Sequence, residues 1–386
     1  MSYPPNRVLS IPPNRFRAVV QLGGLLMLAC AASACGHSDP YPTSVYDTGP
    51  SSAGSDVTLT FNSNQNYWPT LTEDSSAVLY QFIDVNLGAV GLRHRCMGAL
   101  PVAGGTRFWQ WCDTRASETD SSTSFSGFAM GKDGRMLYVE TTTPRLFPFQ
   151  APNTALWLAD TAAPFRRRLL LNLPVVVGDS TINWIADLTW TGPTSFVGLG
   201  QQMIVLPQCD GCTAVDSAFN GEAIVAGTIM GTGATLVAIP GTDGATGYSL
   251  AEDGESIVFS QLDNVNLMQV PVAGGSPTVA ALVTPRIGMQ LLGVSCRETT
   301  CVVALGPATL ANPASKQPRG SGPYELRNVS LTTGTATTVL TSGQPVSSPV
   351  LLPSGDVIAQ VGPGFGHLQT FNSSALTLHL YKGLVP

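Results

Sequence analysis

The chain has 386 residues and a formal net charge of −6, and charged residues make up only 11% of it, against about 25% in typical domains. It contains no basic patch that could neutralise a phosphate backbone, so we expect no nucleic-acid partner. The 40 glycines and 29 prolines, together with many Thr, Ser and Val residues, predict an all-β protein built of strands and turns.

Residues 1–34 have the pattern of a secretory signal peptide and are not expected to belong to the fold. Arg7, Arg15 and Arg17 form a basic start without an acid, and an apolar run over 18–34 follows. The run is short and rich in Gly and Ala, which favours a cleaved signal over a membrane span.

The small residues before Cys35 resemble the signal of bacterial lipoproteins, in which the cysteine is lipidated and becomes the first mature residue. The alternatives are lipidation at Cys30 and an ordinary signal peptide that is cut near Ala34. Residues 35–56 are rich in Ser, Pro, Gly and Thr, so we expect a flexible tether there. Because Gly36 follows the cysteine where inner-membrane lipoproteins have Asp, the resemblance implies an anchor in the outer membrane, with the protein facing the periplasm or the cell surface.

A short phrase recurs along residues 57–386 and predicts a repeat architecture. Residues 71–80 read LTEDSSAVLY, 129–138 read AMGKDGRMLY and 250–259 read LAEDGESIVF, each a strand, an acidic tight turn and a second strand. Weaker copies place further turns near 193, 299 and 355, and between the turns a second hairpin recurs as Pro-Val-Ala-Gly-Gly at 101–105 and 271–275. Four strands in each of six units predict a β-propeller of six four-stranded blades.

The two ends of this region predict how the propeller is closed. The last unit has strands near 348–352, 357–361 and 375–381 and stops one strand short, whereas 57–61 is a strand without a unit of its own. We expect this N-terminal strand to be the missing outer strand, which leaves no open blade. A further turn at Asn220 and Gly221 would make seven blades, but it would leave only 27 residues after the turn at 193, so we prefer six.

The turn phrases, together with LWLAD at 156–160, resemble the repeats of TolB-like, WD40-like propellers of bacterial envelopes. The resemblance covers residues 57–386, although the Ser-Pro that often precedes the family's Asp-Gly is missing. It implies a periplasmic scaffold that binds other proteins, and it transfers no particular binding residue.

Six cysteines beyond the signal region form three local pairs, which we expect to be disulfides in an oxidising compartment. Cys96 and Cys112 lie eight positions on either side of Gly104, and a two-residue turn would place Cys296 opposite Cys301. The third pair is Cys209 and Cys212. For that pair a redox motif or half of a zinc site is the alternative, but no second Cys-x-x-Cys or nearby histidine offers the remaining zinc ligands.

The region offers little material for catalysis. It contains no Gly-x-Ser-x-Gly elbow, no His-Glu-x-x-His motif and no Asp-rich calcium loop, and His37, His94, His367 and His379 are scattered. We therefore assign no catalytic residue, no cofactor and no metal ligand.

One insertion, 143–149, has the composition of a binding loop. It carries Arg145, Phe147 and Phe149, and aromatic residues beside an arginine are typical of binding hot spots. The alternative is that the two phenylalanines pack over the neighbouring blade.

The sequence thus predicts a lipid-anchored propeller of the cell envelope that binds a protein or a glycan without catalysing a reaction. The competing hypothesis is a propeller hydrolase or lyase that acts on a sugar, a lactone or an extracellular polymer at the mouth of the central channel. Several convergent carboxylates at that mouth would favour the enzyme, and a lining of Ser, Thr and apolar residues would favour the scaffold.

Overall fold

The computed structural model describes residues 56–60, 66–84, 94–112, 121–144, 153–162, 166–177, 180–205, 217–261, 266–283, 289–307, 323–362 and 377–385. All of them belong to one compact unit, 43–386. The predicted signal peptide and the tether up to residue 55 lie outside the described residues, and so do Cys30 and Cys35.

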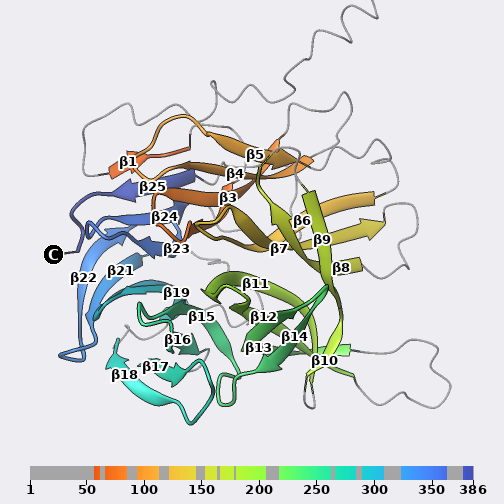
Figure 1. Cartoon of the computed structure of the whole chain (residues 1–386). Coiled ribbons are helices and arrows are strands. Elements are labelled where there is room, and N and C mark those ends of the chain that lie inside the picture. The colour runs from red at the N-terminus through yellow and green to blue at the C-terminus, as the bar shows by residue number, and fades with distance from the viewer. Residues whose placement is uncertain are drawn as a thin grey trace, which may run out of the picture. The chain divides into compact units, whose positions relative to one another are not determined.

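The described residues form six antiparallel sheets, which are the blades of a β-propeller. Figure 1 shows them following one another around a common centre, from the orange strands of blade 1 to the blue strands of blade 6. Blade 1 contains β2 (Asn66–Leu71), β3 (Ala77–Asp84), β4 (His94–Pro101) and β5 (Trp109–Cys112). Blade 2 contains β6 (Ser121–Met130), β7 (Arg135–Pro144), β8 (Asn153–Asp160) and β9 (Arg166–Leu173). Blade 3 contains β10 (Val175–Val177), β11 (Ser180–Gly192), β12 (Ser195–Val205), β13 (Ser217–Met230) and β14 (Gly233–Ala238).

The remaining three blades have four strands each. Blade 4 contains β15 (Ala245–Leu250), β16 (Ser256–Gln261), β17 (Asn266–Pro271) and β18 (Thr278–Leu282). Blade 5 contains β19 (Met289–Arg297), β20 (Thr300–Pro307), β21 (Tyr324–Ser330) and β22 (Thr335–Ser342). Blade 6 contains β23 (Val346–Leu351), β24 (Val357–Val361), β25 (Thr377–Tyr381) and β1 (Asp56–Thr58).

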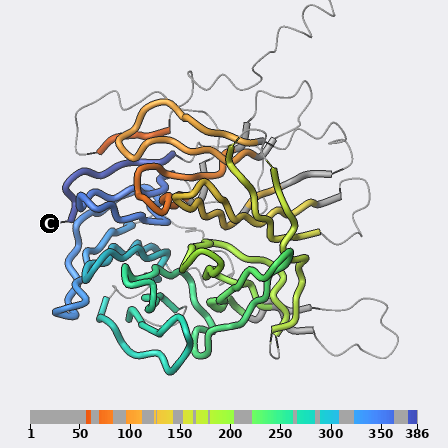
Figure 2. Tube along the Cα trace, viewed as in Figure 1, coloured from red at the N-terminus to blue at the C-terminus, as the bar shows by residue number. Residues whose placement is uncertain are grey.

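The predicted closure is confirmed. Strand β1 pairs with β25 in the register Asp56–Tyr381, Val57–Leu380 and Thr58–His379, so that the N-terminal strand is the outer strand of the last blade. In Figure 2 the red start of the described chain lies beside the dark blue end. Leu59 continues the pairing, because its amide donates to the Leu378 carbonyl at 2.7 Å, and its side chain is fully buried.

The six-blade prediction is also confirmed, with one addition. All six turns expected between the first and second strands of the blades are present, and β10 adds a fifth strand to blade 3 beside β11. The alternative turn at Asn220 and Gly221 is a bulge inside β13: Gln202 pairs with Gly221 and Met203 with Phe219. Gly221 has a positive φ of 116°, and this conformation lets the strand accommodate Asn220 as an extra residue without being broken.

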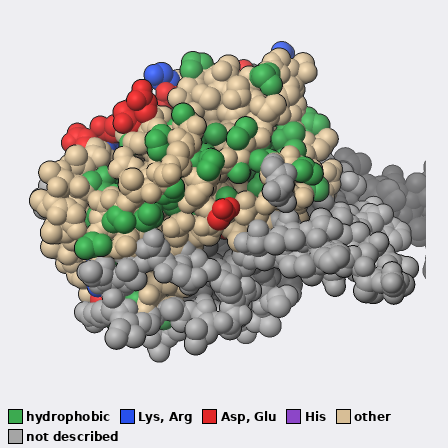
Figure 3. Space-filling model, turned by 90° about the horizontal axis from the view of Figure 1, so that it is seen from below, with side chains coloured by type: hydrophobic (Ala, Val, Ile, Leu, Met, Phe, Trp, Pro, Cys, Tyr) green, Lys and Arg blue, Asp and Glu red, His purple; other side chains and the backbone are tan. Residues whose placement is uncertain are grey.

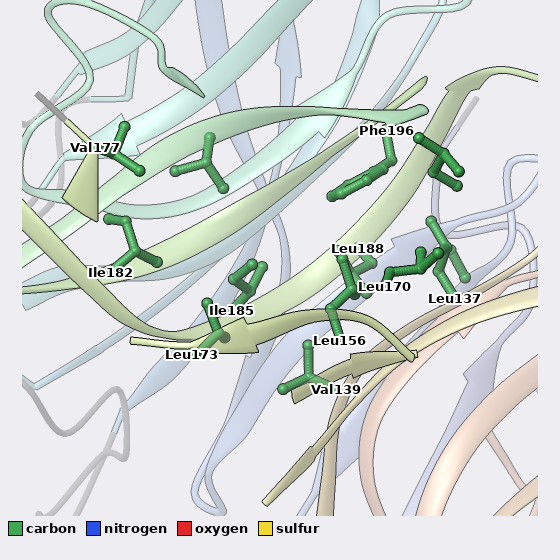
Figure 4. Close-up of a cluster of buried hydrophobic side chains, with 13 residues drawn as sticks. Leu137, Val139, Leu156, Leu170, Leu173, Val177, Ile182, Ile185, Leu188 and Phe196 are labelled. Carbon is green, nitrogen blue, oxygen red and sulfur yellow. The ribbon is translucent and has the colours of Figure 1, made fainter. Parts of the chain in front are cut away.

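The blades pack face to face through apolar side chains that alternate along the strands. Between blades 2 and 3, Leu137, Val139 and Leu156 meet Ile182, Ile185, Leu188 and Phe196 in one buried cluster (Figure 4). Similar clusters lie between blades 1 and 2, 3 and 4, 4 and 5, and 5 and 6. Burying these faces between neighbours is what makes each blade depend on the next.

Polar side chains also join neighbouring blades. Gln81 Oε1 of blade 1 accepts from the Phe125 amide of blade 2 at 2.9 Å, and Ser295 Oγ of blade 5 accepts from the Leu351 amide of blade 6 at the same distance. The Tyr248 hydroxyl of blade 4 donates to the Asp187 carbonyl of blade 3, and burial raises the pKa of this phenol. These contacts fix the inner strands, which line the centre.

The run Arg166–Arg167–Arg168 lies in the outer strand β9. Its middle residue, Arg167, is ion-paired with the buried Glu140 of β7 and lies over the Trp157 ring of β8 at 4.5 Å. A charge on the edge strand thus joins three strands of blade 2 and is not simply solvated.

The surface carries few charges. On the side shown in Figure 3, apolar side chains are dispersed among polar and backbone atoms, and acidic side chains gather at one edge. Within the described part of the chain, no helix is long and apolar enough to cross a membrane.

Candidate functional site

The centre of the propeller encloses a cavity of about 1430 Å³. All six blades contribute residues to its lining, mostly from their inner strands and from the turns that follow them. Two ends can be distinguished along these strands. We call the end formed by the turns between first and second strands the turn-side mouth, and the other end the polar half.

The acidic residues of the recurring phrase cap the turns at the turn-side mouth. Asp74 Oδ1 accepts from the Ser76 amide at 3.1 Å, Asp133 Oδ1 from the Arg135 amide at 3.1 Å, and Asp253 Oδ1 from the Glu255 amide at 2.8 Å. Hydrogen bonds from the Thr72 hydroxyl and from Ser76 hold the pKa of Asp74 below its usual value. The phrase is therefore a structural device, because its carboxylates are used to close the turns.

The other charges of the turn-side mouth form ion pairs. Lys132 Nζ lies 3.4 Å from Glu73 Oε1, and Arg135 Nε lies 2.5 Å from Asp133 Oδ2. Partial desolvation raises the pKa of Asp133, but the hydrogen bonds and charge of Arg135 outweigh it, and the pKa lies below its usual value.

Arg297 connects blades across this mouth. Its Nε lies 3.3 Å from Glu252 Oε1 of blade 4, and its Nη1 donates to Ser75 Oγ of blade 1 at 3.4 Å. Since Arg297 itself ends the inner strand of blade 5, one side chain joins three blades at the mouth. Three carboxylates of this mouth, Glu73, Asp133 and Glu252, are thus each paired with a basic side chain, whereas Asp253 is bonded within its own turn.

Each of the six inner strands is interrupted by a register shift of the kind made by a β-bulge. The shifts lie between Tyr67 and Thr70, Ser126 and Phe128, Ala186 and Thr189, Ala245 and Gly247, Leu291 and Gly293, and Ser347 and Val350. Bulges bend a strand and redirect its side chains, and they are common beside functional sites.

At the bulges the inner strands approach one another through their backbones. A Cβ on Gly127 of blade 2 would lie 2.9 Å from the Ala186 Cα of blade 3, and a Cβ on Gly293 of blade 5 would lie 3.5 Å from the Ser348 Cα of blade 6. Glycine is required at Gly127 for a second reason, its φ of +52°. The six bulges therefore form a ring between the two ends of the cavity, which is closely packed between blades 2 and 3 and between blades 5 and 6.

The polar half is lined by two rows of side chains that run across adjacent strands. In blade 2, Ser124 pairs with Thr141, and Thr141 pairs with Thr154. In blade 3, Trp184 pairs with Gln201, and Gln201 pairs with Glu222. Cross-strand partners point to the same face of a sheet, and all six residues line the cavity.

Two further amides complete the polar half. Asn183 is the extra residue of a second bulge in β11, where Ile182 pairs with Gln202 and Trp184 with Gln201. Its Oδ1 is buried and has no hydrogen-bond partner among the described residues. Gln360 of blade 6 also lines the cavity. The arrangement offers hydroxyl, amide and indole groups, which can bind a ligand but are poor acids and bases, together with the one carboxylate of Glu222.

The cysteine predictions can be followed in part. Cys296 and Cys301 form a disulfide with a Cα–Cα distance of 3.9 Å, on either side of the predicted two-residue turn. Cys96 is disulfide-bonded, and Cys112 is its partner in the strand register. Cys209 and Cys212 lie outside the described residues, so that pair stays a prediction.

The predicted binding loop cannot be compared with the cavity. Strand β7 ends at Pro144, and Arg145, Phe147 and Phe149 lie outside the described residues, as do His37 and His367. His379 lies in β25, where its Nδ1 is 2.8 Å from Asp56 Oδ1, and it supports the closing strand. The described residues contain no group of three or more His, Cys, Asp or Glu side chains that could hold a metal ion.

Sequence reasoning missed the two polar rows. A signal was present, because the buried face of β7 reads Leu137, Val139, Thr141, so that an apolar alternation ends on a hydroxyl. The partner residues on β8 and β12 carry no such mark in the sequence, since their neighbours across the sheet become known only from the register.

Comparison with known proteins shows no family. No protein-family model matches the chain, and no curated protein matches its sequence. The similar solved structures include a gluconolactonase from Xanthomonas campestris, with a TM-score of 0.45 and 13% identity over 86% of this chain and 89% of that one. A putative TolB from Agrobacterium tumefaciens has a TM-score of 0.44 and 16% identity over 80% and 93%. The β-propeller domain of the Trilobed protease from Pyrococcus furiosus has a TM-score of 0.45 and 10% identity over 83% and 93%. At such low values these similarities carry no argument about what the cavity binds.

Proposed function

We propose that this protein is a non-enzymatic binding scaffold of the bacterial cell envelope, whose central cavity receives a protein or a glycan. The observation that carries the proposal is the lining of the cavity. Hydroxyl, amide, indole and backbone groups and the single carboxylate of Glu222 line the polar half, while the carboxylates Glu73, Asp133 and Glu252 at the turn-side mouth are paired with basic residues.

This distribution favours binding over chemistry for a physical reason. General acid–base catalysis needs titratable groups within reach of the substrate and with pKa values near the working pH. The pairing with Arg135 holds the pKa of Asp133 below its usual value, which makes it a poorer proton donor and acceptor at neutral pH. Hydroxyl and amide groups, by contrast, orient a ligand by hydrogen bonds, as in most small-molecule sites.

A test of this proposal is to fill the cavity. The variant Thr191→Trp adds a large side chain at a residue that lines the cavity, and Thr235→Trp adds the same side chain at an exposed position of the outer strand β14. The full chain and both variants are used to capture partners from detergent-solubilised envelopes, with quantitative mass spectrometry for proteins and sugar analysis for glycans. We expect a partner that the wild type and Thr235→Trp retain and Thr191→Trp loses. Equal capture by all three proteins would refute a binding role for the cavity.

The location in the envelope is the second part of the proposal and rests on the N-terminal sequence. A basic start, an apolar run, Cys35 and a tether rich in Ser and Pro support a lipid anchor in the outer membrane. Metabolic labelling with a fatty-acid probe should modify the wild type and not Cys35→Ala. Equal labelling of both proteins would move the lipid to Cys30, and no labelling of either would leave an ordinary secreted protein.

A further inference from the structure

The two polar rows have the spacing and the chemistry of a surface that reads hydroxyl groups. Ser124, Thr141 and Thr154 lie side by side on β6, β7 and β8, and Thr141 Oγ1 is 3.1 Å from Thr154 Oγ1. Adjacent strands lie about 4.8 Å apart, so the row presents a hydroxyl at each step of about one sugar ring. Each hydroxyl can donate one hydrogen bond and accept two.

This row begins where the apolar packing between blades ends. Leu137 and Val139 point from β7 into the buried cluster between blades 2 and 3 (Figure 4). Thr141 follows them at the same alternation of the strand and therefore lies on the same face. Thr154 of the third strand β8 also lines the cavity, although only 6% of its surface is exposed. A lining that includes hydroxyls of three adjacent strands suits a chain of several units better than a single small molecule.

The second row adds an aromatic face. Trp184, Gln201 and Glu222 are neighbours across β11, β12 and β13, and the indole of Trp184 is half-buried beside the cavity. An indole ring has an electron-rich face that attracts the polarised C–H groups on one side of a sugar ring. Next to it an amide and a carboxylate can bind hydroxyls, and the Asn183 Oδ1 is a buried acceptor without a partner among the described residues.

The charges favour a neutral ligand. The only charged side chain in the two rows is the carboxylate of Glu222, which repels an anion. The cavity-lining cations Lys132, Arg135 and Arg297 belong to the turn-side mouth and are held in ion pairs there. An extended peptide is less well matched, because the backbones of β7 and β12 are paired on both sides and leave no edge for it to join.

We propose that the polar half of the cavity binds a neutral oligosaccharide, with Trp184 as the stacking surface and Thr141, Thr154 and Gln201 as hydrogen-bonding groups. The inference rests on the proposed scaffold function and names the ligand class of the same cavity. Asn183 precedes Trp184 in β11 and contributes an amide at the place where the strand bulges.

The test measures binding of maltohexaose, cellohexaose and chitohexaose to the full chain by titration calorimetry, with hexagalacturonate as the anionic comparison. We expect saturable binding of at least one neutral hexasaccharide and at least tenfold weaker binding of the hexagalacturonate. Loss of one hydrogen bond between neutral groups should weaken binding about fivefold. We expect this loss of affinity for each hydrogen bond to the ligand that is removed by Gln201→Leu, or by the double variant Thr141→Val with Thr154→Val.

The controls make the same substitutions outside the cavity. Gln269→Leu in β17 and Thr235→Val in β14 should leave the affinity unchanged within twofold. Trp184→Phe keeps an aromatic ring and should weaken binding less than Trp184→Ala. If the latter unfolds, the Phe variant and the Gln201→Leu variant still decide the matter.

The outcomes separate this inference from the scaffold proposal. If no neutral hexasaccharide binds while Thr191→Trp still loses a protein partner, the ligand class is wrong and the scaffold stands. Equal binding of the hexagalacturonate, or equal effects of cavity and control variants, would also overturn the inference. Conversion of a bound sugar into products would instead overturn the non-enzymatic function and support the hydrolase or lyase.

Discussion

The ring of bulges makes a prediction that two glycines can test against each other. Gly127 lies in a bulge of blade 2 with a φ of +52°, and Gly231 lies in an exposed turn of blade 3 with a φ of +57°. An alanine at either position pays the same backbone penalty of about 1–2 kcal/mol. Only at Gly127 would the new Cβ also come within 2.9 Å of the Ala186 backbone in the next blade, whereas nothing lies within 4 Å at Gly231.

We expect Gly231→Ala to lower the free energy of unfolding by about 1 kcal/mol. Gly127→Ala should lower it by about 1–3 kcal/mol more, because backbone atoms of a neighbouring blade must move to admit the methyl group. Urea unfolding followed by tryptophan fluorescence measures both values by linear extrapolation. If the two variants are destabilised equally, the inner strands do not touch at the bulges, and the closely packed ring is wrong.

Three further predictions concern closure, the inner contacts and acid. Leu59→Ala should lower the free energy of unfolding by about 3 kcal/mol, because it empties a fully buried site beside the closing strand. Tyr248→Phe should cost about 1–2 kcal/mol, because it leaves the half-buried Asp187 carbonyl without this donor. The pKa of Asp74 is lowered by folding, so its stabilising effect is complete above the unfolded value of 3.8 and is lost as the pH falls through the folded pKa. Asp74→Asn should therefore flatten the loss of stability below about pH 4.

Each of these three has a result that contradicts it. Thr58→Ala, at a half-buried position of β1, is the control for closure, and an effect as large as that of Leu59→Ala would mean that Leu59 is not specially buried. No change in stability for Tyr248→Phe would remove the hydroxyl as a link between blades 3 and 4. An unchanged acid dependence for Asp74→Asn, measured as urea midpoints from pH 2.5 to pH 6, would show that this carboxylate is not stabilised by folding.

Much of the fold could be predicted because its signals are local. An acidic residue, a tight turn and alternating apolar residues lie within ten positions of each other, and their repetition shows how many blades there are. The Cys296–Cys301 pairing follows from a two-residue turn in the same way. The closing strand was predictable because the last unit lacks its fourth strand and the strand at 57–61 belongs to no unit of its own.

The polar rows and the bulge ring were decided by the tertiary structure. Trp184 and Glu222 are 38 residues apart and become neighbours only through the register that each shares with Gln201, and that register is shifted by the bulge at Asn183. Arg297 likewise reaches Ser75 only because the ring is closed.

The sequence by itself thus determined the β-propeller class, the six blades, the closure and the Cys296–Cys301 pair, because turn chemistry and strand alternation act within one hairpin. Only the tertiary structure decided which side chains face the cavity. A shift of one residue at a bulge reverses the face of every side chain that follows, and the bulges form where inner strands of neighbouring blades crowd against one another.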